Sequence, residues 1–201
     1  MKDLASHIMD IVENSIRAKA RKVEIDVCEN YKEDSFVIEI RDNGGGMNAE
    51  TLKQVGDPFY TSRTVRKVGL GIPLLIQNAE QTGGKVTIHS IQGEGTSLCA
   101  RFTHSHLDRP PFGDVAIPLG LLAVAHPAIR FIYTHTTPEG RYLFDTENVY
   151  QLLNGVPLDH PDILSAMQEM IRENLKNIHS EQYINGIRKE YLNTKYLNIN
   201  L

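Results

Sequence analysis

Residues 10–15 read Asp-Ile-Val-Glu-Asn-Ser and form the middle of a helix that the sequence predicts over residues 3–18. Apolar side chains recur at helical spacing along one side of this segment, as in helices that pack one face against a core. His7, Asp10 and Asn14 fall on the polar side. Asp10 and Asn14 are four residues apart, so their side chains project together. A carboxylate beside an amide oxygen suits Mg²⁺, because substrate phosphates and water can complete its ligands. A solvated polar face is the plainer interpretation.

A glycine-rich stretch, Asp-Asn-Gly-Gly-Gly-Met at residues 42–47, follows a strand that alternates apolar and charged residues up to Ile40. A similar alternation over residues 23–27 predicts the other strand of a hairpin. Glycine has no Cβ, so the backbone there can approach a flat base or a phosphate closely. Gly69-Leu70-Gly71 opens a later helix, whose free N–H groups and positive dipole end suit phosphate. Turn glycines are common, so neither cluster alone distinguishes a nucleotide site from ordinary turns.

The remaining elements follow from periodicity and turn residues. Predicted in chain order are a short helix capped by Asn48, a polar loop at 57–68, a helix after Gly71, strands around 86–88 and 98–102, a helix at 114–125, a hairpin of strands 129–133 and 141–144, and helices at 146–153 and 161–177. A change of composition at residues 104–111, which include two prolines, predicts a connector. Residues 180–201 are polar and are expected to form a tail.

Composition and charge exclude several classes of protein. The 201 residues carry a net charge of −4, so no electrostatic attraction to nucleic acid or to an anionic membrane is expected. The first residues do not resemble a secretory signal, and the most apolar stretch, residues 115–129, is too short to span a bilayer. Cys28 and Cys99 are too few for a disulfide framework and are expected to be buried thiols in a reducing compartment. We therefore expect a cytoplasmic protein.

The order of five motifs carries more information than any one of them. They are a helix with Glu13-Asn14, a strand end with Asp-Asn-Gly-Gly-Gly-Met, a loop with Asp-Pro-Phe-Tyr-Thr-Ser-Arg at 57–63, a helix start with Gly-Leu-Gly-Ile at 69–72, and a turn with Gly-Glu-Gly-Thr at 93–96. This order resembles the N, G1, F, G2 and G3 boxes of the GHKL ATPase superfamily, which includes gyrase B, the heat-shock chaperone ATPase, histidine kinases and MutL. The resemblance covers about residues 4–103, half of the chain.

The resemblance implies an α/β fold, the two-layer Bergerat sandwich, with helices packed on one face of a mixed sheet. We expect an ATP-binding domain over residues 1–103, an appended helix and β-hairpin over 104–145, and a helical C-terminal region with its tail over 146–201. Asp42 would accept a hydrogen bond from the adenine amino group, and Asn14 would hold Mg²⁺ against the phosphates. The other residues that the resemblance assigns to the nucleotide, some of them in a lid over 57–68, are Gly44, Gly46, Met47, Thr61, Ser62, Arg63, Gly69, Leu70, Gly71 and Thr96.

Asp10 stands at the position where hydrolytic members of the superfamily typically carry a glutamate that acts as general base. Histidine kinases typically carry an amide there. An aspartate can remove a proton but is one methylene shorter. Two functions therefore stay open. The chain is either a Mg²⁺-dependent ATPase or protein kinase with Asp10 as base, or an ATP-gated switch that regulates a partner with little turnover.

Expected partners are ATP and a protein of unknown identity, and a homodimer is left open. Neither nucleic acid nor a membrane is expected. A self-phosphorylating histidine kinase is not expected either, because such proteins carry a phosphoacceptor histidine before the catalytic domain. Here the N box begins close to Met1.

Overall fold

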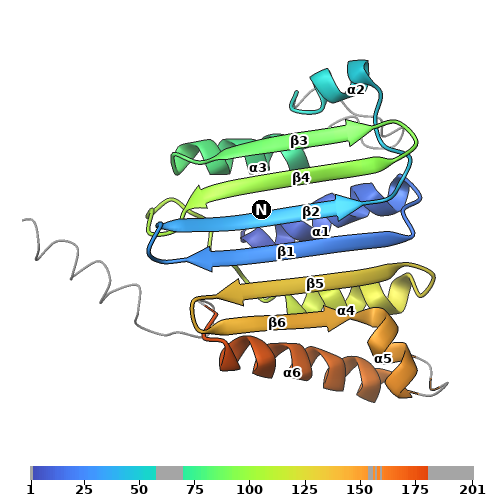
Figure 1. Ribbon diagram of the computed structural model, residues 1–201. Helices are drawn as coiled ribbons and strands as arrows, with labels where there is room; N and C mark the ends of the chain where they lie inside the picture. Colours follow the sequence, from blue (N-terminus) through green and yellow to red (C-terminus); the bar gives the residue numbers. More distant parts are fainter. Residues whose placement is uncertain (1, 58–69, 154–155, 157, 159, 181–201) are drawn as a thin grey trace, which may run out of the picture.

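The computed structural model describes residues 2–57, 70–153, 156, 158 and 160–180. The helices and strands follow one another along the chain as shown in Figure 1. In order they are α1 (Leu4–Arg17), β1 (Lys22–Asn30), β2 (Ser35–Asp42), α2 (Ala49–Gln54), α3 (Gly71–Gln81), β3 (Lys85–Ile91), β4 (Gly95–Thr103), α4 (Ala116–Ala125), β5 (Arg130–Thr137), β6 (Gly140–Asp145), α5 (Thr146–Leu153) and α6 (Pro161–Asn177).

The strands form one mixed sheet of six strands in the order β3-β4-β2-β1-β5-β6. β1 and β2 form the expected antiparallel hairpin, and β4 pairs antiparallel with both β2 and β3. In the sheet, Asp42 pairs with Val23 of β1 on one side and with Thr96 of β4 on the other. Asp42 is therefore held at the end of the central strands. The expected mixed α/β sandwich is confirmed.

β5 pairs in parallel with β1, and β6 then pairs antiparallel with β5. Elements that follow residue 103 thus extend the same sheet that the first four strands build (Figure 1). The division of the chain at residues 103 and 145 stays a prediction. The hydrogen bonds of the sheet nevertheless run without a break from the N-terminal region into the appended hairpin.

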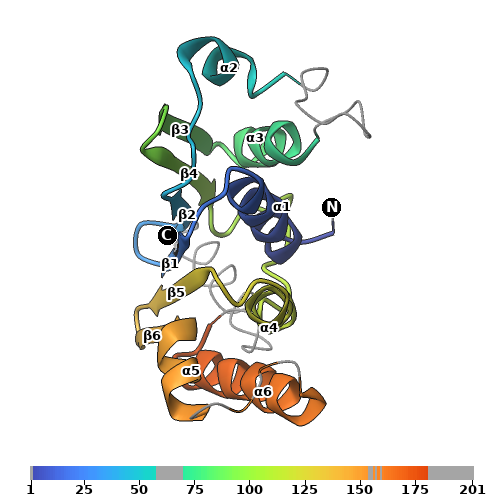
Figure 2. The same ribbon diagram turned by 90° about the vertical axis from the view of Figure 1, so that its right-hand side faces the viewer.

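Helices α1, α3 and α4 lie together on one side of the sheet (Figure 2). Because side chains alternate along a strand, β1 buries Val23, Ile25 and Val27 toward these helices and turns the residues between them outward. Cys28 is therefore exposed, and Cys99 of β4 is half-buried. The expectation of two buried thiols was wrong for Cys28, because its position in the alternation faces solvent.

Helix α1 forms where the sequence predicts it, for local reasons. Asp3 caps its start by accepting a hydrogen bond from the backbone N–H of Ser6, at 2.8 Å. The next free N–H groups, those of Leu4 and Ala5, donate to carbonyl oxygens of residues 111 and 112 at 2.9 and 2.8 Å. The connector after the fourth strand thus completes the helix N-terminus, which would otherwise leave these donors unpaired.

The apolar stripe of α1 is buried against the sheet, as its spacing predicts. Its fully buried members are Leu4, Ala5, Ile8, Ile11 and Val12. Complete burial of one such aliphatic side chain contributes about 1.5–3 kcal/mol relative to its exposure. This packing fixes the rotation of α1 on the sheet, and so decides which of its polar residues face the neighbouring cavity. Within the described residues, no helix is both long and apolar enough to cross a membrane.

Candidate functional site: a pocket between the first helix, the sheet and the third helix

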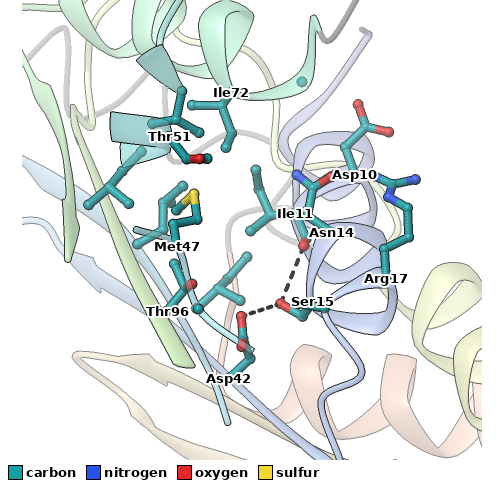
Figure 3. Close-up of a pocket in the computed structure, with 17 residues that line it drawn as sticks. Asp10, Ile11, Asn14, Ser15, Arg17, Asp42, Met47, Thr51, Ile72 and Thr96 are labelled. Atoms are coloured by element: carbon teal, nitrogen blue, oxygen red, sulfur yellow. Dashed lines mark hydrogen bonds between the residues drawn. The ribbon is translucent and has the colours of Figure 1, made fainter. Parts of the chain in front are cut away.

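A cavity of about 400 Å³ opens where α1, the ends of the central strands, α2 and α3 meet (Figure 3). This volume lies within the range of small-molecule sites, roughly 300–1,000 Å³. The polar side chains on its wall come from α1, the end of β2, α2 and β4. The apolar part of the wall is formed by Ile11, Ile40, Met47, Val55, Ile72, Ile88 and Leu98.

Asp42 is held at one end of the pocket by two hydrogen bonds. The hydroxyl of Ser15 donates to Oδ2 at 2.7 Å (Figure 3), and the backbone N–H of Gly44 donates to Oδ1 at 2.8 Å. An ionised carboxylate has about four acceptor positions, so each oxygen keeps one for another donor. The carboxylate is therefore oriented by the protein while it can still accept from a ligand. Sequence reasoning missed Ser15, because this contact arises only where α1 packs against the end of β2.

The glycines after Asp42 serve the packing of the chain itself. Gly46 has φ of +61°, and a Cβ there would overlap the carbonyl oxygen of Ile91. A Cβ at Gly44 would come within 2.8 Å of the carbonyl oxygen of Ala18, at the end of α1. Both positions thus require glycine for close approach of backbone to backbone. Gly46 lines the cavity, whereas Gly44 does not.

Ser90 of β3 supports the neighbouring wall of the pocket through hydrogen bonds to residues that line it. Its Oγ accepts the backbone N–H of Met47 at 2.8 Å and lies 2.9 Å from Oγ1 of Thr96. It also donates to the carbonyl oxygen of Gly95 at 3.0 Å. Met47 and Thr96 both line the pocket, so this one hydroxyl fixes two of the predicted residues. Nothing in the sequence marks Ser90, which looks like any polar residue in a strand.

The other end of the pocket is formed by the polar side of α1 and the start of α3. Asp10, Asn14 and Arg17 line it together (Figure 3). The guanidinium of Arg17 donates through Nη2 to Oδ1 of Asn14. A Cβ at Gly71 would lie 3.2 Å from Oδ2 of Asp10, so the first residue of α3 packs directly against this carboxylate. Asp10 and Asn14 lie one turn apart on α1, as expected, and both line one cavity.

His7, which the sequence puts on the polar side of α1, is buried and does not line the pocket. Only 1% of His7 is exposed, because α3 covers this side of α1. Its Nε2 lies 2.9 Å from the side-chain amide nitrogen of Asn78. Burial lowers the pKa of His7 to about 4, since the charged imidazolium would be removed from water. His7 is therefore a neutral contact between two helices rather than a residue that lines the pocket.

The structure brings most of the predicted residues together. Those that line the cavity are Asp10, Asn14, Asp42, Gly46, Met47, Gly71 and Thr96. Leu70 caps α3 without lining the pocket and is 45% exposed. Four predicted residues, in the loop over 57–68 and just after it, lie outside the described residues, namely Thr61, Ser62, Arg63 and Gly69. Pocket residues that sequence reasoning missed include Ser15, Arg17 and Thr51.

The sequence matches the family of histidine kinase-, DNA gyrase B- and HSP90-like ATPases over residues 2–106. Sporulation kinase C of Bacillus subtilis (strain 168) is 31% identical over 88 residues, which are 44% of this chain and 20% of that protein. Sensor histidine kinase YxdK of the same organism is 32% identical over 99 residues, which cover 45% of this chain and 30% of that protein. The chain thus spans between a fifth and a third of the length of these curated relatives.

Among solved structures, the N-terminal domain of a DNA repair protein superposes with a TM-score of 0.55 at 21% identity. The superposition covers 71% of this chain and 52% of that chain, and it shows that the fold is shared. The family match extends over more than half of the 201 residues and contains every described residue of the pocket. It confirms the resemblance that the five motifs indicated. The chain therefore belongs to the family of histidine kinase-, DNA gyrase B- and HSP90-like ATPases.

Proposed function

We propose that the pocket binds ATP, with the adenine ring at Asp42 and the phosphates at the end formed by Asp10, Asn14 and Gly71. The observation that carries this proposal is the carboxylate of Asp42, fixed from two sides by Ser15 and Gly44 inside a cavity. The adenine amino group is a donor that matches the remaining acceptor capacity of this carboxylate. The apolar wall then accommodates the flat faces of the ring.

The opposite end of the pocket supports the placement of phosphates. Gly71 is the first residue of α3, and backbone N–H groups in the first turn of a helix have no partners within the helix. The positive end of the helix dipole adds to the attraction for anions. Glycine at this position also lets the helix start approach Asp10, so that phosphate-facing backbone and carboxylate sit side by side.

Asn14 suits a divalent cation next to the phosphates. It supplies an amide oxygen to a cavity that Asp10, one turn away on α1, also lines. Mg²⁺ takes oxygen ligands and keeps several waters, so one or two protein oxygens suffice. When bound, Mg²⁺ neutralises phosphate charge during phosphoryl transfer. Among the described residues there is no cluster of three or more His, Cys, Asp or Glu that could hold a metal without such help.

We propose further that the chain uses ATP as a Mg²⁺-dependent ATPase or protein kinase, with Asp10 as general base. The carboxylate would accept a proton from the attacking water, or from a hydroxyl of a partner protein, as that oxygen bonds to the γ-phosphorus. The bond between the γ-phosphorus and the β–γ bridging oxygen breaks in the same step, and ADP leaves with the bonding electron pair. The packing of Gly71 at the start of α3 against this carboxylate supports a role for Asp10 at the proposed phosphate end of the pocket. A cytoplasmic location, where ATP is supplied, belongs to the same proposal.

An ATP-gated switch with little turnover is the second candidate, and one observation favours it. β1 carries the register partner of Asp42 on one side and pairs with β5 on the other. A shift at the pocket therefore has a direct route through the sheet into the part of the chain after residue 103. A partner protein bound there would sense the nucleotide without any cleavage of ATP.

Single-turnover cleavage of ATP with Mg²⁺, measured beside nucleotide affinity, separates the two candidates. If Asp10 is the base, Asp10→Asn should lower the cleavage rate by about 10²-fold or more, while ATP affinity changes little. The same assay with Asp108→Asn, in an exposed turn after β4, controls for the loss of one negative charge outside the lining of the cavity. Cleavage by Asp10→Asn at the wild-type rate would remove the base assignment. Tight binding without cleavage by the wild type would select the switch.

A further inference from the structure

Arg17 is the only positively charged side chain among the described residues that line the pocket. It lies on the last turn of α1, next to Asn14 (Figure 3). Its Nη2 donates to Oδ1 of Asn14, and its Nη1 lies 3.6 Å from a carboxylate oxygen of Glu13. The side chain is 45% exposed, so it can change position at little cost in packing.

The contact between Arg17 and Asn14 occupies the side-chain oxygen that the proposed Mg²⁺ would need as a ligand. Asn14 offers one side-chain oxygen, and the proposed Mg²⁺ site takes that oxygen as a ligand. A guanidinium has only donors and is permanently charged, whereas Mg²⁺ demands close and near-octahedral oxygen ligands. Two cations that share one neutral oxygen at contact distance repel each other strongly. The guanidinium and the metal ion therefore exclude each other at Oδ1 of Asn14.

We propose that Arg17 is a built-in competitor of Mg²⁺ for Asn14. Without metal, the guanidinium occupies Oδ1 of Asn14 and supplies the positive charge at this end of the pocket. Entry of Mg²⁺ requires Arg17 to leave Asn14, and Glu13 offers the departing guanidinium an anionic partner one turn away. Arg17 thereby sets how strongly nucleotide binding depends on Mg²⁺. This inference rests on the proposed nucleotide site.

The quantity to measure is the ratio of nucleotide affinity with Mg²⁺ to nucleotide affinity in EDTA. Calorimetry with ADP and with a non-hydrolysable ATP analogue gives this ratio without any turnover. Removal of Arg17 frees Asn14 for the metal and also lowers affinity in EDTA, because a positive charge is lost. For a half-exposed contact we expect Arg17→Ala to raise the ratio about two- to fivefold. Arg21→Ala, which removes an equal charge outside the pocket lining, should leave it unchanged.

A double-mutant cycle with Asn14→Ala distinguishes competition at Asn14 from a general effect of charge on the phosphates. If Arg17 acts through Asn14, its removal should raise the ratio clearly less once Asn14 is alanine, because only the effect of the lost charge remains. An equal rise in both backgrounds would overturn the inference, as would an unchanged ratio in Arg17→Ala alone. Thermal unfolding of the variants checks that each is folded. If the wild type binds neither nucleotide, the proposed function fails and this inference fails with it, whereas binding with an unaltered ratio refutes the inference alone.

Discussion

The side chain of Asp42 is held in one orientation by donors from two separate segments. Ser15 donates to one carboxylate oxygen and Gly44 to the other, so the plane of the carboxylate is fixed. The two donors differ in whether they accept a donor in place of the carboxylate oxygen. A hydroxyl can turn to accept instead of donate, but a backbone N–H cannot. Any replacement for Asp42 must therefore present an acceptor to Gly44, which limits what it can present to the pocket.

Asp42→Asn should weaken ADP binding about tenfold or more. The amide oxygen must face Gly44, so the amide nitrogen is left to face the proposed adenine amino group, donor against donor. Loss of a hydrogen bond to a charged acceptor costs about 1.5–3 kcal/mol, which corresponds to this change in affinity. Calorimetry measures it, with Asp26→Asn on the open face of the sheet as control for charge. Unchanged affinity in Asp42→Asn would contradict the assignment of Asp42 to adenine.

At the scale of elements, the packing of α1 against α3 explains what could be predicted and what could not. The bounds of α1 follow from the capping residue Asp3 and from the apolar stripe, which are local properties of the sequence. The hairpin of β1 and β2 follows equally from local alternation. His7 was misplaced because its burial depends on α3, which is more than sixty residues away in sequence. Cys28 was misplaced because the choice of the buried sheet face is likewise not local.

The buried contact between His7 of α1 and Asn78 of α3 predicts that the stability of the folded protein depends on pH. Burial holds the pKa of His7 near 4, below its usual value of 6.5, so the unfolded chain binds a proton in this interval while the folded protein does not. Stability is therefore highest above pH 6.5 and falls as the pH drops toward 4, by up to about 3 kcal/mol. His7→Gln, which retains a hydrogen-bonding side chain toward Asn78, should be less sensitive to pH in this interval.

Urea unfolding at pH 7.0, 5.5 and 4.5 measures this difference. His126→Gln provides the matched control, because it removes a histidine that lies at the C-terminal end of α4 instead of between α1 and α3. Identical pH slopes for the wild type and His7→Gln would contradict a neutral, buried His7.

At the scale of the whole molecule, a buried carboxylate joins segments that are far apart in sequence. Glu29, near the end of β1, accepts hydrogen bonds from His135 of β5 at 2.7 Å and from Ser180 at 2.9 Å. The hydroxyl of Tyr31 donates to its other oxygen at 2.9 Å. Burial alone would raise the pKa of Glu29, but hydrogen bonds from His104, His135 and Tyr31 outweigh it and hold the pKa well below its usual value. The end of α6 is thereby tied to the first strand.

Glu29→Gln should lower the free energy of unfolding at pH 7 by about 2–4 kcal/mol, because charged hydrogen bonds inside the protein are lost. Since the folded-state pKa is depressed, this stabilisation is complete above the unfolded pKa of about 4.3 and is lost as the pH falls below it. The difference from the wild type should therefore shrink in acid. Urea unfolding at pH 7 and pH 3.5 measures it, with Glu94→Gln in an exposed turn as control.

Nucleotide affinity of Glu29→Gln should equal that of the wild type. Glu29 lies six residues along β1 from Val23, the register partner of Asp42, which is roughly 20 Å in a strand. If folded Glu29→Gln bound nucleotide more weakly than the wild type at pH 7, the hydrogen bonds around Glu29 would also act on the pocket.

The parallel pairing of β5 with β1 has a consequence for any shortened form of the chain. Without the residues after 103, β1 would become an edge strand, with one row of backbone N–H and C=O groups left unpaired over most of its length. Such an edge is a template for strand addition by another chain, and the neighbouring apolar residues of β1 would lose part of their cover. A fragment that contains all five motifs would thus keep the pocket residues and become prone to aggregation. We therefore expect the appended hairpin to protect the solubility of the half that carries the pocket.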